Sequence, residues 1–246
     1  CLCFGNPEKP NQMWEFVEAV RGVSDACNAI RLKENQEYST PIIAGNVSFY
    51  NESKSGAIPP SPIVSCLGRI KNVETTITTS LKKAGSIILM VGARKDELGG
   101  SLFYDLHNEL GANVPSPDLE EVKRQIYAVT DCIDEGLLYA CHDISDGGIS
   151  VAMSEMTFDN NIGCSVKVPG CLSSEKLLFT ETGGFLIEVD NKNLQKVENI
   201  LKNYDLDFSN IGTTNNKPQI SINNAIKISV KEAKTLWQHG LRNKIK

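Results

Sequence analysis

The chain has 246 residues, of which 41% are hydrophobic and 22% are charged, and its formal net charge is −5. These proportions are typical of a soluble globular protein, and the length allows one large domain or two modest ones. No apolar run approaches the roughly 20 residues of a membrane-spanning helix. The mildly acidic balance also lacks the basic patches of a dedicated nucleic-acid binder. We therefore expect neither a membrane nor a nucleic acid as partner.

Eight cysteines are spread along the chain without a C-x-x-C pair. A chain of this size does not need disulfides to fold, so we interpret the cysteines as reduced thiols of a cytoplasmic protein. A zinc site is the alternative, but the ligand spacing is missing and only three histidines are present. The sequence begins without Met or a secretory signal, and it looks like a piece of a longer chain.

One amphipathic helix and short strands are predicted for the first 80 residues. Apolar residues recur at intervals of three and four after a Pro10-Asn11 start signal, which predicts a helix over 11–30. An apolar run predicts a short buried strand over 41–44. A second strand is predicted over 63–70, and the prolines before it confine its start to a sheet edge or a turn. The Ser- and Thr-rich run that follows has no helical period, and we place a domain boundary near residue 80.

Strands and helices alternate irregularly after residue 80. The predicted elements, in chain order, are a strand over 86–91, helices over 102–110 and 118–135, a strand, acidic Gly-rich turn and helix around 142–158, a strand over 185–189, a helix over 194–201, strands over 219–222 and 226–230, and a C-terminal helix around Trp237. This order predicts a mixed α/β (α+β) fold with layered packing.

Gly45-Asn46-Val47-Ser48 follows the first predicted strand. Glycine lets a ligand approach the backbone closely, an Asn carbonyl oxygen can bind a metal ion, and a Ser hydroxyl can donate to an oxyanion. The same residue types are favoured at ordinary strand ends. The motif alone leaves both interpretations open.

His142-Asp143-Ile144-Ser145-Asp146-Gly147-Gly148 combines two carboxylates with glycines before a helix. Mg²⁺ prefers oxygen ligands and often binds one or two carboxylates together with nucleotide phosphates. The free N–H groups at a helix start bind anions. A simple helix N-cap uses the same residue types. The pattern therefore indicates either a nucleotide and metal site or a cap.

Two further turns are weaker candidates. Gly99-Gly100-Ser101 precedes a helix and suits a phosphate, and Glu181 places a carboxylate either in a cleft or in a polar turn. Neither the P-loop nor the Rossmann glycine pattern is present, and the G-x-S-x-G motif of hydrolases is missing. His107 and His239 have no partner at ligand spacing, so we assign them no role.

Several of these motifs together closely resemble the synthetase subunit family of phosphoribosylformylglycinamidine synthase. They follow the family's order and cover nearly the whole chain: Cys1-Leu2-Cys3-Phe4-Gly5-Asn6-Pro7-Glu8-Lys9-Pro10, Trp14, 45–52, 97–101, 142–148 and 178–181. Wider relatives are aminoimidazole ribonucleotide synthetase, selenophosphate synthetase and thiamine monophosphate kinase. The resemblance implies a pseudo-dimer of two similar halves, of which this chain is most of the second. It would contain a partial N-type domain over 1–80 and a complete C-type α/β sandwich domain over 81–246.

The implied activity is that of an ATP-dependent ligase of purine biosynthesis, which converts formylglycinamide ribonucleotide and ammonia to formylglycinamidine ribonucleotide. The implied cofactors are ATP and Mg²⁺. The implied partners are the missing N-terminal half, a glutaminase subunit that supplies ammonia, and the ribonucleotide substrate. The family's catalytic His belongs to the first half, and His142 is not that residue. The resemblance therefore assigns no catalytic residue to this chain, and the fragment alone should not turn over.

The resemblance also assigns site residues. Gly45 would contact ATP, Asn46 would bind Mg²⁺ and Ser48 would contact the substrate. Asp143 matches a metal-binding carboxylate of the first half, and Glu181 matches a Glu of a substrate loop. The alternative is that these two serve an auxiliary nucleotide site, whose residues would be Gly99, Gly100, Ser101, Asp146, Gly147, Gly148 and Glu181.

Two departures from the family pattern bear on these assignments. Cys3 stands where family members usually carry Asn, and an ATP-binding Asp expected just before Cys1 lies outside the sequence. Two other functions stay open beside the ligase. The chain could be a non-catalytic nucleotide-binding scaffold, or a kinase of the same superfamily.

Overall fold

A computed structural model of the chain describes residues 1–70 and 72–244. The chain forms two compact units, Cys1–Lys71 and Asn72–Lys246. The contacts thus divide it at 71/72, before the boundary that the sequence predicts near residue 80. The division into an N-type domain over 1–80 and a C-type domain over 81–246 stays a prediction.

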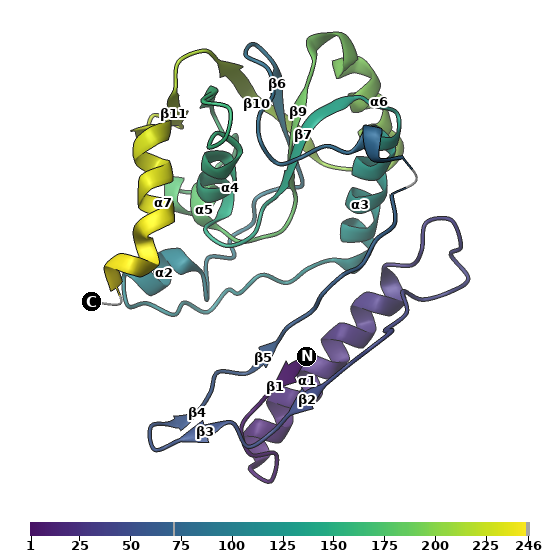
Figure 1. Cartoon of the computed structure of the whole chain (residues 1–246), viewed down its shortest axis with the longest axis vertical. Helices are drawn as coiled ribbons and strands as arrows, with labels where there is room; N and C mark the ends of the chain where they lie inside the picture. Colours follow the sequence, from purple (N-terminus) through teal and green to yellow (C-terminus); the bar gives the residue numbers. More distant parts are fainter. Residues whose placement is uncertain (71, 245–246) are drawn as a thin grey trace. The chain divides into compact units, whose positions relative to one another are not determined.

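The first unit contains one long helix and very short strands (Figure 1). Its central strand pairs in parallel with one neighbour and antiparallel with the other, in the order β2-β1-β5, and a separate hairpin joins β3 to β4. The bounds are β1 Leu2–Cys3, α1 Pro10–Ala29, β2 Val47–Ser48, β3 Glu52–Ser53, β4 Gly56–Ala57 and β5 Ser61–Pro62.

The helix predicted over 11–30 is confirmed, because α1 spans Pro10–Ala29 with proline at its start. The strands predicted over 41–44 and 63–70 are wrong, since neither range contains a strand in the structure. The short β1 offers a ladder of only two residues to each neighbour. Val47–Ser48 is therefore itself a strand, and the predicted motif lies in β2 and just before it rather than at the end of a preceding strand.

The second unit is built on a seven-stranded sheet in the order β12-β11-β8-β10-β6-β9-β7. All neighbouring strands in it are antiparallel except β8 and β11. The bounds are η1 Val73–Thr75, β6 Ile87–Val91, α2 Leu102–Leu106, α3 Leu119–Asp134, β7 Leu138–Asp143, α4 Gly148–Met156, β8 Gly163–Val166, α5 Ser174–Phe179, β9 Phe185–Val189, η2 Asn191–Asn193, α6 Leu194–Asn203, β10 Phe208–Asn215, β11 Gln219–Ile222, β12 Ile226–Ser229 and α7 Val230–Lys244.

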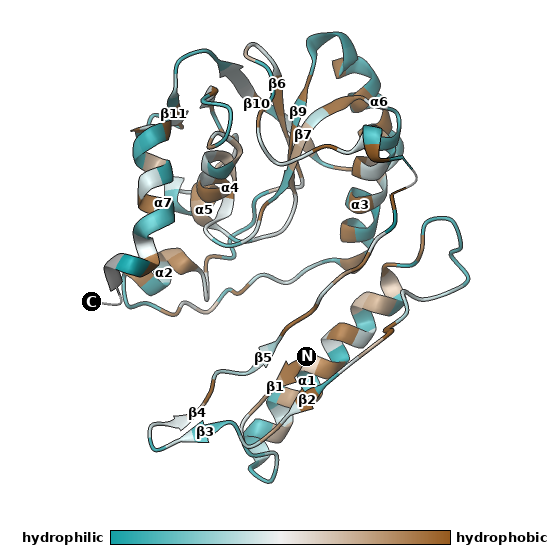
Figure 2. Cartoon of the chain, in the orientation of Figure 1, coloured by the Kyte–Doolittle hydropathy of each residue, from teal (hydrophilic) through white to brown (hydrophobic). Residues whose placement is uncertain are grey.

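Helices cover both faces of this sheet (Figure 1). In β6 the side chains of Ile88 and Met90 enter a core shared with α4, α5 and α7. Its other side chains, Ile87, Leu89 and Val91, enter a core shared with α3 and α6. Strand residues alternate between faces, so a strand buried on both sides is apolar throughout. In Figure 2 the strands β6 and β9 are accordingly mostly brown.

This three-layer arrangement confirms the predicted mixed α/β fold. The sequence missed β8, α5 and β10. Strand β10 is largely polar and changes register between Asn210 and Gly212, so its residues show no regular alternation. All eight cysteines are free. Among the described residues, none of the helices combines the length and hydrophobicity needed to cross a bilayer.

Candidate functional site

Three turns of the second unit meet at the carboxylate of Glu181. Its Oε1 accepts hydrogen bonds from the backbone N–H of Leu102 and of Gly147, each at 2.9 Å. Leu102 is the first residue of α2, and Gly147 precedes α4. N–H groups at helix starts have no partner within the helix and attract negative charge. The structure therefore joins turns that the sequence singled out one by one.

Gly148 lets α4 begin directly against the end of α5. Its φ is +64°, and a Cβ atom there would lie 2.8 Å from the carbonyl oxygens of both Leu178 and Thr180. Only glycine tolerates both the backbone conformation and this close approach. The position thus fixes the turn of Asp146 and Gly147 close to the residues that precede Glu181.

Hydroxyl groups hold the same turns to the segment after β6. Thr182 donates to Glu97 Oε2 at 2.8 Å, and Thr180 donates to the backbone oxygen of Glu97 at 2.9 Å. Ser101 caps α2, because its Oγ accepts from Tyr104 N at 3.3 Å. In the Gly99-Gly100-Ser101 turn, Ser101 is therefore the N-cap of α2.

Asp143 ends β7 with its side chain 62% exposed. The neighbouring His142 places Nδ1 2.7 Å from the backbone oxygen of Asp143 and Nε2 3.1 Å from Glu155 Oε2. The indole N–H of Trp237 in α7 donates to Glu155 Oε1 at 2.7 Å. A series of polar contacts thus connects Trp237 of the C-terminal helix, through Glu155 and His142, to Asp143, the predicted metal ligand. Glu155 and Trp237 carry no local motif and come from separate helices, α4 and α7, so the sequence analysis missed both.

Arg94 is a second residue that the sequence analysis missed. Its Nη2 donates to the backbone oxygen of Gly183, whereas Nε and Nη1 are buried without a hydrogen-bond partner among the described residues. Burial lowers the pKa of Arg94 to about 10, and the nearby Glu97 and Glu121 oppose this shift. The guanidinium is still cationic at neutral pH. Buried donors without partners are rare and suit an acceptor such as phosphate, carboxylate or water.

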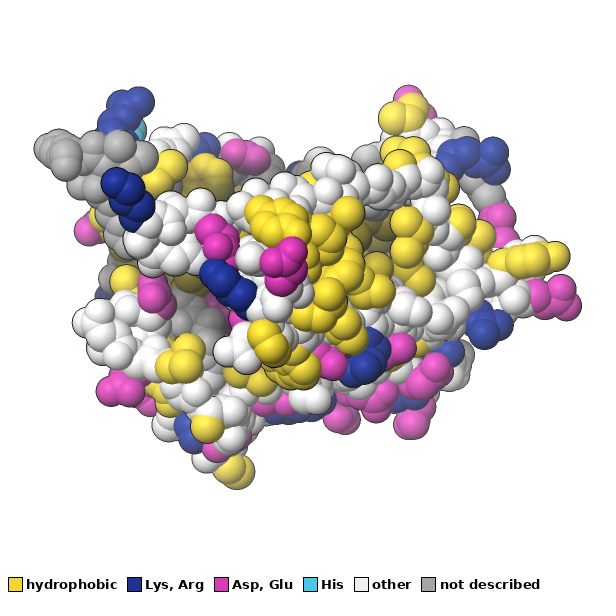
Figure 3. All heavy atoms as spheres, turned by 90° about the horizontal axis from the view of Figure 1, so that it is seen from below, with side chains coloured by type: hydrophobic (Ala, Val, Ile, Leu, Met, Phe, Trp, Pro, Cys, Tyr) yellow, Lys and Arg dark blue, Asp and Glu magenta, His cyan; other side chains and the backbone are white. Residues whose placement is uncertain are grey.

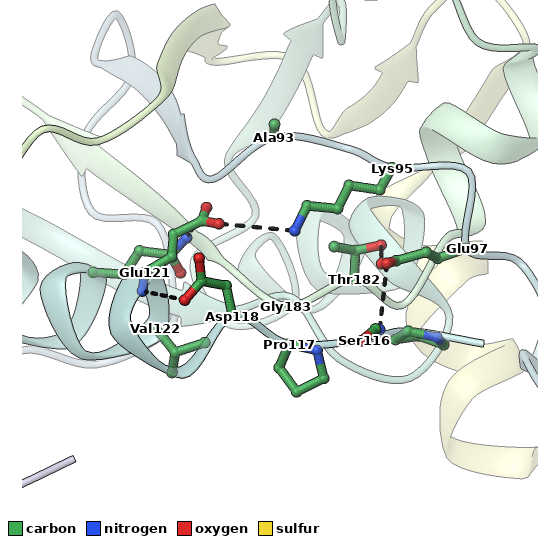
Figure 4. A pocket seen from close by; sticks show the side chains of 12 residues that line it. Ala93, Lys95, Glu97, Ser116, Pro117, Asp118, Glu121, Val122, Thr182 and Gly183 are labelled. Atoms are coloured by element: carbon green, nitrogen blue, oxygen red, sulfur yellow. Dashed lines mark hydrogen bonds and ion pairs between the residues drawn. The ribbon is translucent and has the colours of Figure 1, made fainter. Parts of the chain in front are cut away.

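A small cavity lies beside these turns (Figure 4). Its volume is about 60 Å³, and its lining includes Lys95, Glu97, Asp118, Glu121 and Thr182. A single water molecule needs about 10–15 Å³ of such volume, so the cavity holds a few waters and is too small for a nucleotide. The lining carboxylates are themselves engaged; Lys95 Nζ, for example, lies 3.8 Å from Glu121 Oε2. The cavity fits water or a small ion.

The first unit holds the other predicted site residues. The backbone oxygen of Asn46 accepts from Leu2 N at 2.9 Å, and its Nδ2 lies 3.8 Å from Cys1 Sγ. Within residues 1–70 and 72–244, its Oδ1 has no hydrogen-bond partner. Ser48 is half-buried and donates to Asn51 Oδ1 at 3.2 Å. A Cβ atom on Gly45 would meet nothing within 4 Å, so nothing nearby requires glycine there.

The loop after β2 is held in an unusual conformation. Tyr50 has φ of +60°, which is rare for a bulky residue. Its backbone N–H donates to Gly5 O at 3.0 Å. Next to it, Glu52 accepts from Asn6 N at 3.0 Å and from Lys9 Nζ at 2.9 Å, and these contacts lower its pKa. The loop that follows the predicted ATP contact is thereby tied to the start of α1.

The two predicted Mg²⁺ ligands lie in different units, Asn46 in the first and Asp143 in the second. The described residues contain no group of three or more His, Cys, Asp or Glu that could hold a metal ion. Each predicted ligand nevertheless offers an exposed oxygen, and Mg²⁺ usually binds one or two protein groups together with phosphates and water. Their chemistry fits this partial role.

Comparison with known proteins identifies the family of this chain. The family model "AIR synthase related protein, C-terminal domain" matches residues 83–223. The phosphoribosylformylglycinamidine synthase subunit PurL of Methanothrix thermoacetophila is 40% identical over 98% of this chain and 32% of its own length. PurL of Alkaliphilus metalliredigens is 35% identical, with the same coverage. The chain thus spans about a third of the length of these curated relatives.

Solved structures show the same fold. T. maritima PurL complexed with FGAR superposes with a TM-score of 0.69 at 15% identity, over 94% of this chain and 38% of that one. T. maritima PurL complexed with ATP gives a TM-score of 0.53 at 15% identity, over 72% and 28% of the two chains. The family match, the long curated alignments and the shared fold agree, and the chain belongs to the AIR synthase related family.

Proposed function

We propose that this chain is the C-terminal half of an ATP-dependent ligase that makes formylglycinamidine ribonucleotide from formylglycinamide ribonucleotide and ammonia in purine biosynthesis. The observation that carries the proposal is the 40% identity to a PurL subunit over 98% of the chain. In this reaction the γ-phosphoryl group of ATP activates the amide oxygen, and ammonia then displaces phosphate. We place the enzyme in the cytoplasm, where free cysteines stay reduced.

The residues around β2 are the proposed contribution of this chain to the ATP site. Asn46 supplies its unpartnered amide oxygen to Mg²⁺, Gly45 leaves room for the nucleotide, and Ser48 presents its hydroxyl to the substrate. Phosphoryl transfer depends mostly on positioning and on neutralising charge, which such groups provide. The open surface around Gly45 supports this role, because nothing in the chain itself explains the glycine.

A reconstituted enzyme tests the proposal. When the remaining part of the synthetase is supplied, ammonia-dependent formation of the amidine should appear, and this chain alone should not turn over. Asn46→Ala should lower the rate at least about tenfold, the equivalent of about 1.4 kcal/mol of transition-state stabilisation. Asn203→Ala, on the exposed end of α6, is the matched control and should leave the rate unchanged. An unchanged rate in Asn46→Ala would remove Asn46 from the site.

The remaining half of the synthetase is the proposed partner of the first unit. Among residues 1–70, Phe4 is the one large hydrophobic side chain that is buried. Large hydrophobic residues stay exposed on α1 and on the extended segments: Met13, Trp14, Val17, Val20, Ile42, Ile43, Ile63, Val64 and Leu67. Figure 3 shows apolar side chains gathered on one face of the molecule. Exposed apolar surface of this extent is typical of an interface.

Two more partners complete the proposal. A glutaminase subunit would deliver ammonia, and the ribonucleotide would bind where both halves meet. PurLQS from Thermotoga maritima superposes with a TM-score of 0.53 at 16% identity, and its name joins PurL with further subunits. Co-purification of this chain with the remaining half and the glutaminase, and loss of glutamine-dependent but not ammonia-dependent activity without the glutaminase, would test both partners.

A nucleotide-binding scaffold is the second candidate function, and Arg94 favours it. Its Nε and Nη1 are buried without a hydrogen-bond partner among the described residues, and such donors suit a phosphate oxygen. If the chain is a nucleotide-binding scaffold, ADP and Mg²⁺ should raise its melting temperature. Asp143→Ala should abolish this rise, and Asn46→Ala should leave it unchanged. The opposite result would favour the ligase site around β2.

A further inference from the structure

Two thiols lie side by side at the start of the chain. The Sγ atoms of Cys1 and Cys3 are 3.6 Å apart. Residues two apart on a strand point to the same face, and the next residue points to the other. Phe4 packs edge-on against Phe16 of α1, with ring centroids 5.4 Å apart. The thiol pair therefore occupies the face of β1 that points away from this aromatic contact. Cys1 is exposed and Cys3 is half-buried, so small solutes can reach the pair.

The backbone beneath the pair is held from both sides. Leu2 N donates to Asn46 O and Phe4 N to Ser48 O, both at 2.9 Å, on the side of β2. Ile63 N donates to Cys1 O at 2.8 Å on the other side. Closing a disulfide must therefore distort this short strand, because the Cβ atoms of residues two apart on a strand lie about as far apart as their Cα atoms, whereas those of a disulfide lie about 3.5–4.5 Å apart.

The spacing brings a disulfide within reach. Two residues of a strand span about 6.4–6.8 Å, and the Cα atoms of a disulfide lie about 4.4–6.8 Å apart. From their separation of 3.6 Å, the sulfurs need to approach by roughly 1.5 Å to reach the S–S bond length of about 2.05 Å. A disulfide at the upper end of the Cα range is strained and easily reduced. The bridge would therefore be reversible.

We propose that Cys1 and Cys3 form a reactive dithiol that closes to an intramolecular disulfide by exchange with a low-molecular-weight disulfide. One thiolate attacks the oxidant, breaks its S–S bond and releases one small thiol. The second thiolate then displaces the other small thiol from the mixed disulfide. In sum, the two protein thiols and one disulfide oxidant give one protein disulfide and two small thiols, which take up the two protons.

The pair also touches a residue of the proposed ATP site, and this step rests on the proposed function. Cys1 Sγ lies 3.8 Å from Asn46 Nδ2. Closure turns this sulfur toward Cys3 and removes the contact that helps to orient the Asn46 amide. Oxidation therefore weakens binding of Mg·ATP, and bound Mg·ATP in turn slows oxidation.

Oxidised glutathione is the probe for the dithiol. The reduced full chain is treated with about 0.1 mM oxidant, its remaining thiols are alkylated, and its peptides are weighed. Neighbouring thiols have an effective concentration of millimolar or more, so closure should exceed double glutathionylation at least about tenfold. The exposed single thiols of Cys66 and Cys171 serve as internal controls and should keep glutathione adducts.

The variant Cys3→Ser should trap glutathione on Cys1, because the second displacement is then lost. Separate glutathione adducts on Cys1 and Cys3 of the unaltered chain would overturn the proposal. So would two unmodified thiols at these positions while Cys66 and Cys171 react. The unaltered chain decides the question by itself, whether or not the variant folds.

Mg·ATP is titrated calorimetrically into the reduced and the oxidised form of the chain, both carrying Cys66→Ser and Cys171→Ser. This comparison separates the dithiol proposal from the proposed function. Weaker binding to the oxidised form supports the link through Asn46. A disulfide that forms without changing the affinity overturns that link alone. If Asn46→Ala does not affect Mg·ATP binding in the reduced form, the proposed metal role fails and the dithiol stands.

Discussion

The two units of this chain differ in how much of their apolar surface they bury by themselves. In the second unit, every residue of β6 is buried between two layers of helices. In the first unit, α1 has no buried residue and Trp14 is 64% exposed. Burial of apolar surface supplies most of the favourable free energy of folding. The second unit therefore contains its own core, while the first depends on apolar contacts that residues 1–70 do not provide for one another.

Core truncations should show the largest contrast between the units. Leu186 of β9 is fully buried, and Leu186→Ala should lower the free energy of unfolding by about 3–5 kcal/mol through lost burial and a residual cavity. Val17 of α1 is 40% exposed, and Val17→Ala should cost less than about 1 kcal/mol. Urea denaturation followed by circular dichroism measures both values. Similar losses in the two variants would contradict the contrast.

Two glycines of the second unit, Gly148 and Gly240, should respond in opposite ways to substitution by alanine. Gly148→Ala places a Cβ atom 2.8 Å from two carbonyl oxygens at a φ of +64°. It should cost about 2–3 kcal/mol of stability, because clash and backbone strain add. Gly240 of α7 has nothing within 4 Å of an added Cβ. Gly240→Ala should instead stabilise the helix by up to about 1 kcal/mol. Equal effects of the two substitutions on the melting temperature would refute the packing described for Gly148.

Sequence patterns predicted the fold best where one pattern runs through a whole element. Strand β6 was predicted from its unbroken apolar run, and helices α3 and α6 were predicted from apolar residues at helical spacing. Segments 41–44 and 63–70 carry apolar runs without a strand partner, and there the prediction was wrong. Both segments are exposed in the structure, and an apolar run does not by itself supply the neighbouring strand with which a strand must pair.

The candidate site was predicted in the same partial way. Glycine-rich and acidic turns have local signatures, so the turns around Gly99, Asp146 and Glu181 were found separately. Their meeting at one carboxylate depends on the neighbouring positions of β6, β9 and β7 in the sheet. Arg94 lies in no motif, and its importance follows from burial alone. Such residues need the structure, because nothing in the local sequence distinguishes them from a surface residue.

Replacing the bridging carboxylate should have an intermediate effect. Glu181→Gln removes a charged acceptor shared by two backbone N–H groups, and should cost about 1–2 kcal/mol of stability. Glu109→Gln, at an exposed position after α2, is the control and should stay within about 0.5 kcal/mol of the unaltered chain. Thermal unfolding at neutral pH measures both. A neutral Glu181→Gln would mean that the two helix starts do not depend on its charge.

The smallest expected effect is a pH dependence that also belongs to the second unit. Hydrogen bonds from Lys83 and Tyr139 hold the pKa of Asp190 well below its usual range. Because the folded-state pKa is lowered, the stabilisation is present above about pH 4, the pKa of an unfolded Asp, and is lost as the pH falls further. The difference in melting temperature between the unaltered chain and Asp190→Asn should therefore shrink from pH 5 to pH 3. A constant difference over this range would contradict the assignment.

Hydrogen exchange of the intact chain tests the contrast between the units most directly. Amides of β6 and β9 should exchange only through global opening of the second unit, while amides of α1 should exchange at least about tenfold faster, since local opening costs less where few side chains are buried. Addition of the remaining part of the proposed synthetase should slow exchange in α1 and leave β6 unchanged. Equal protection of α1 and β6 in the chain alone would contradict the account, because the first unit would then be complete by itself.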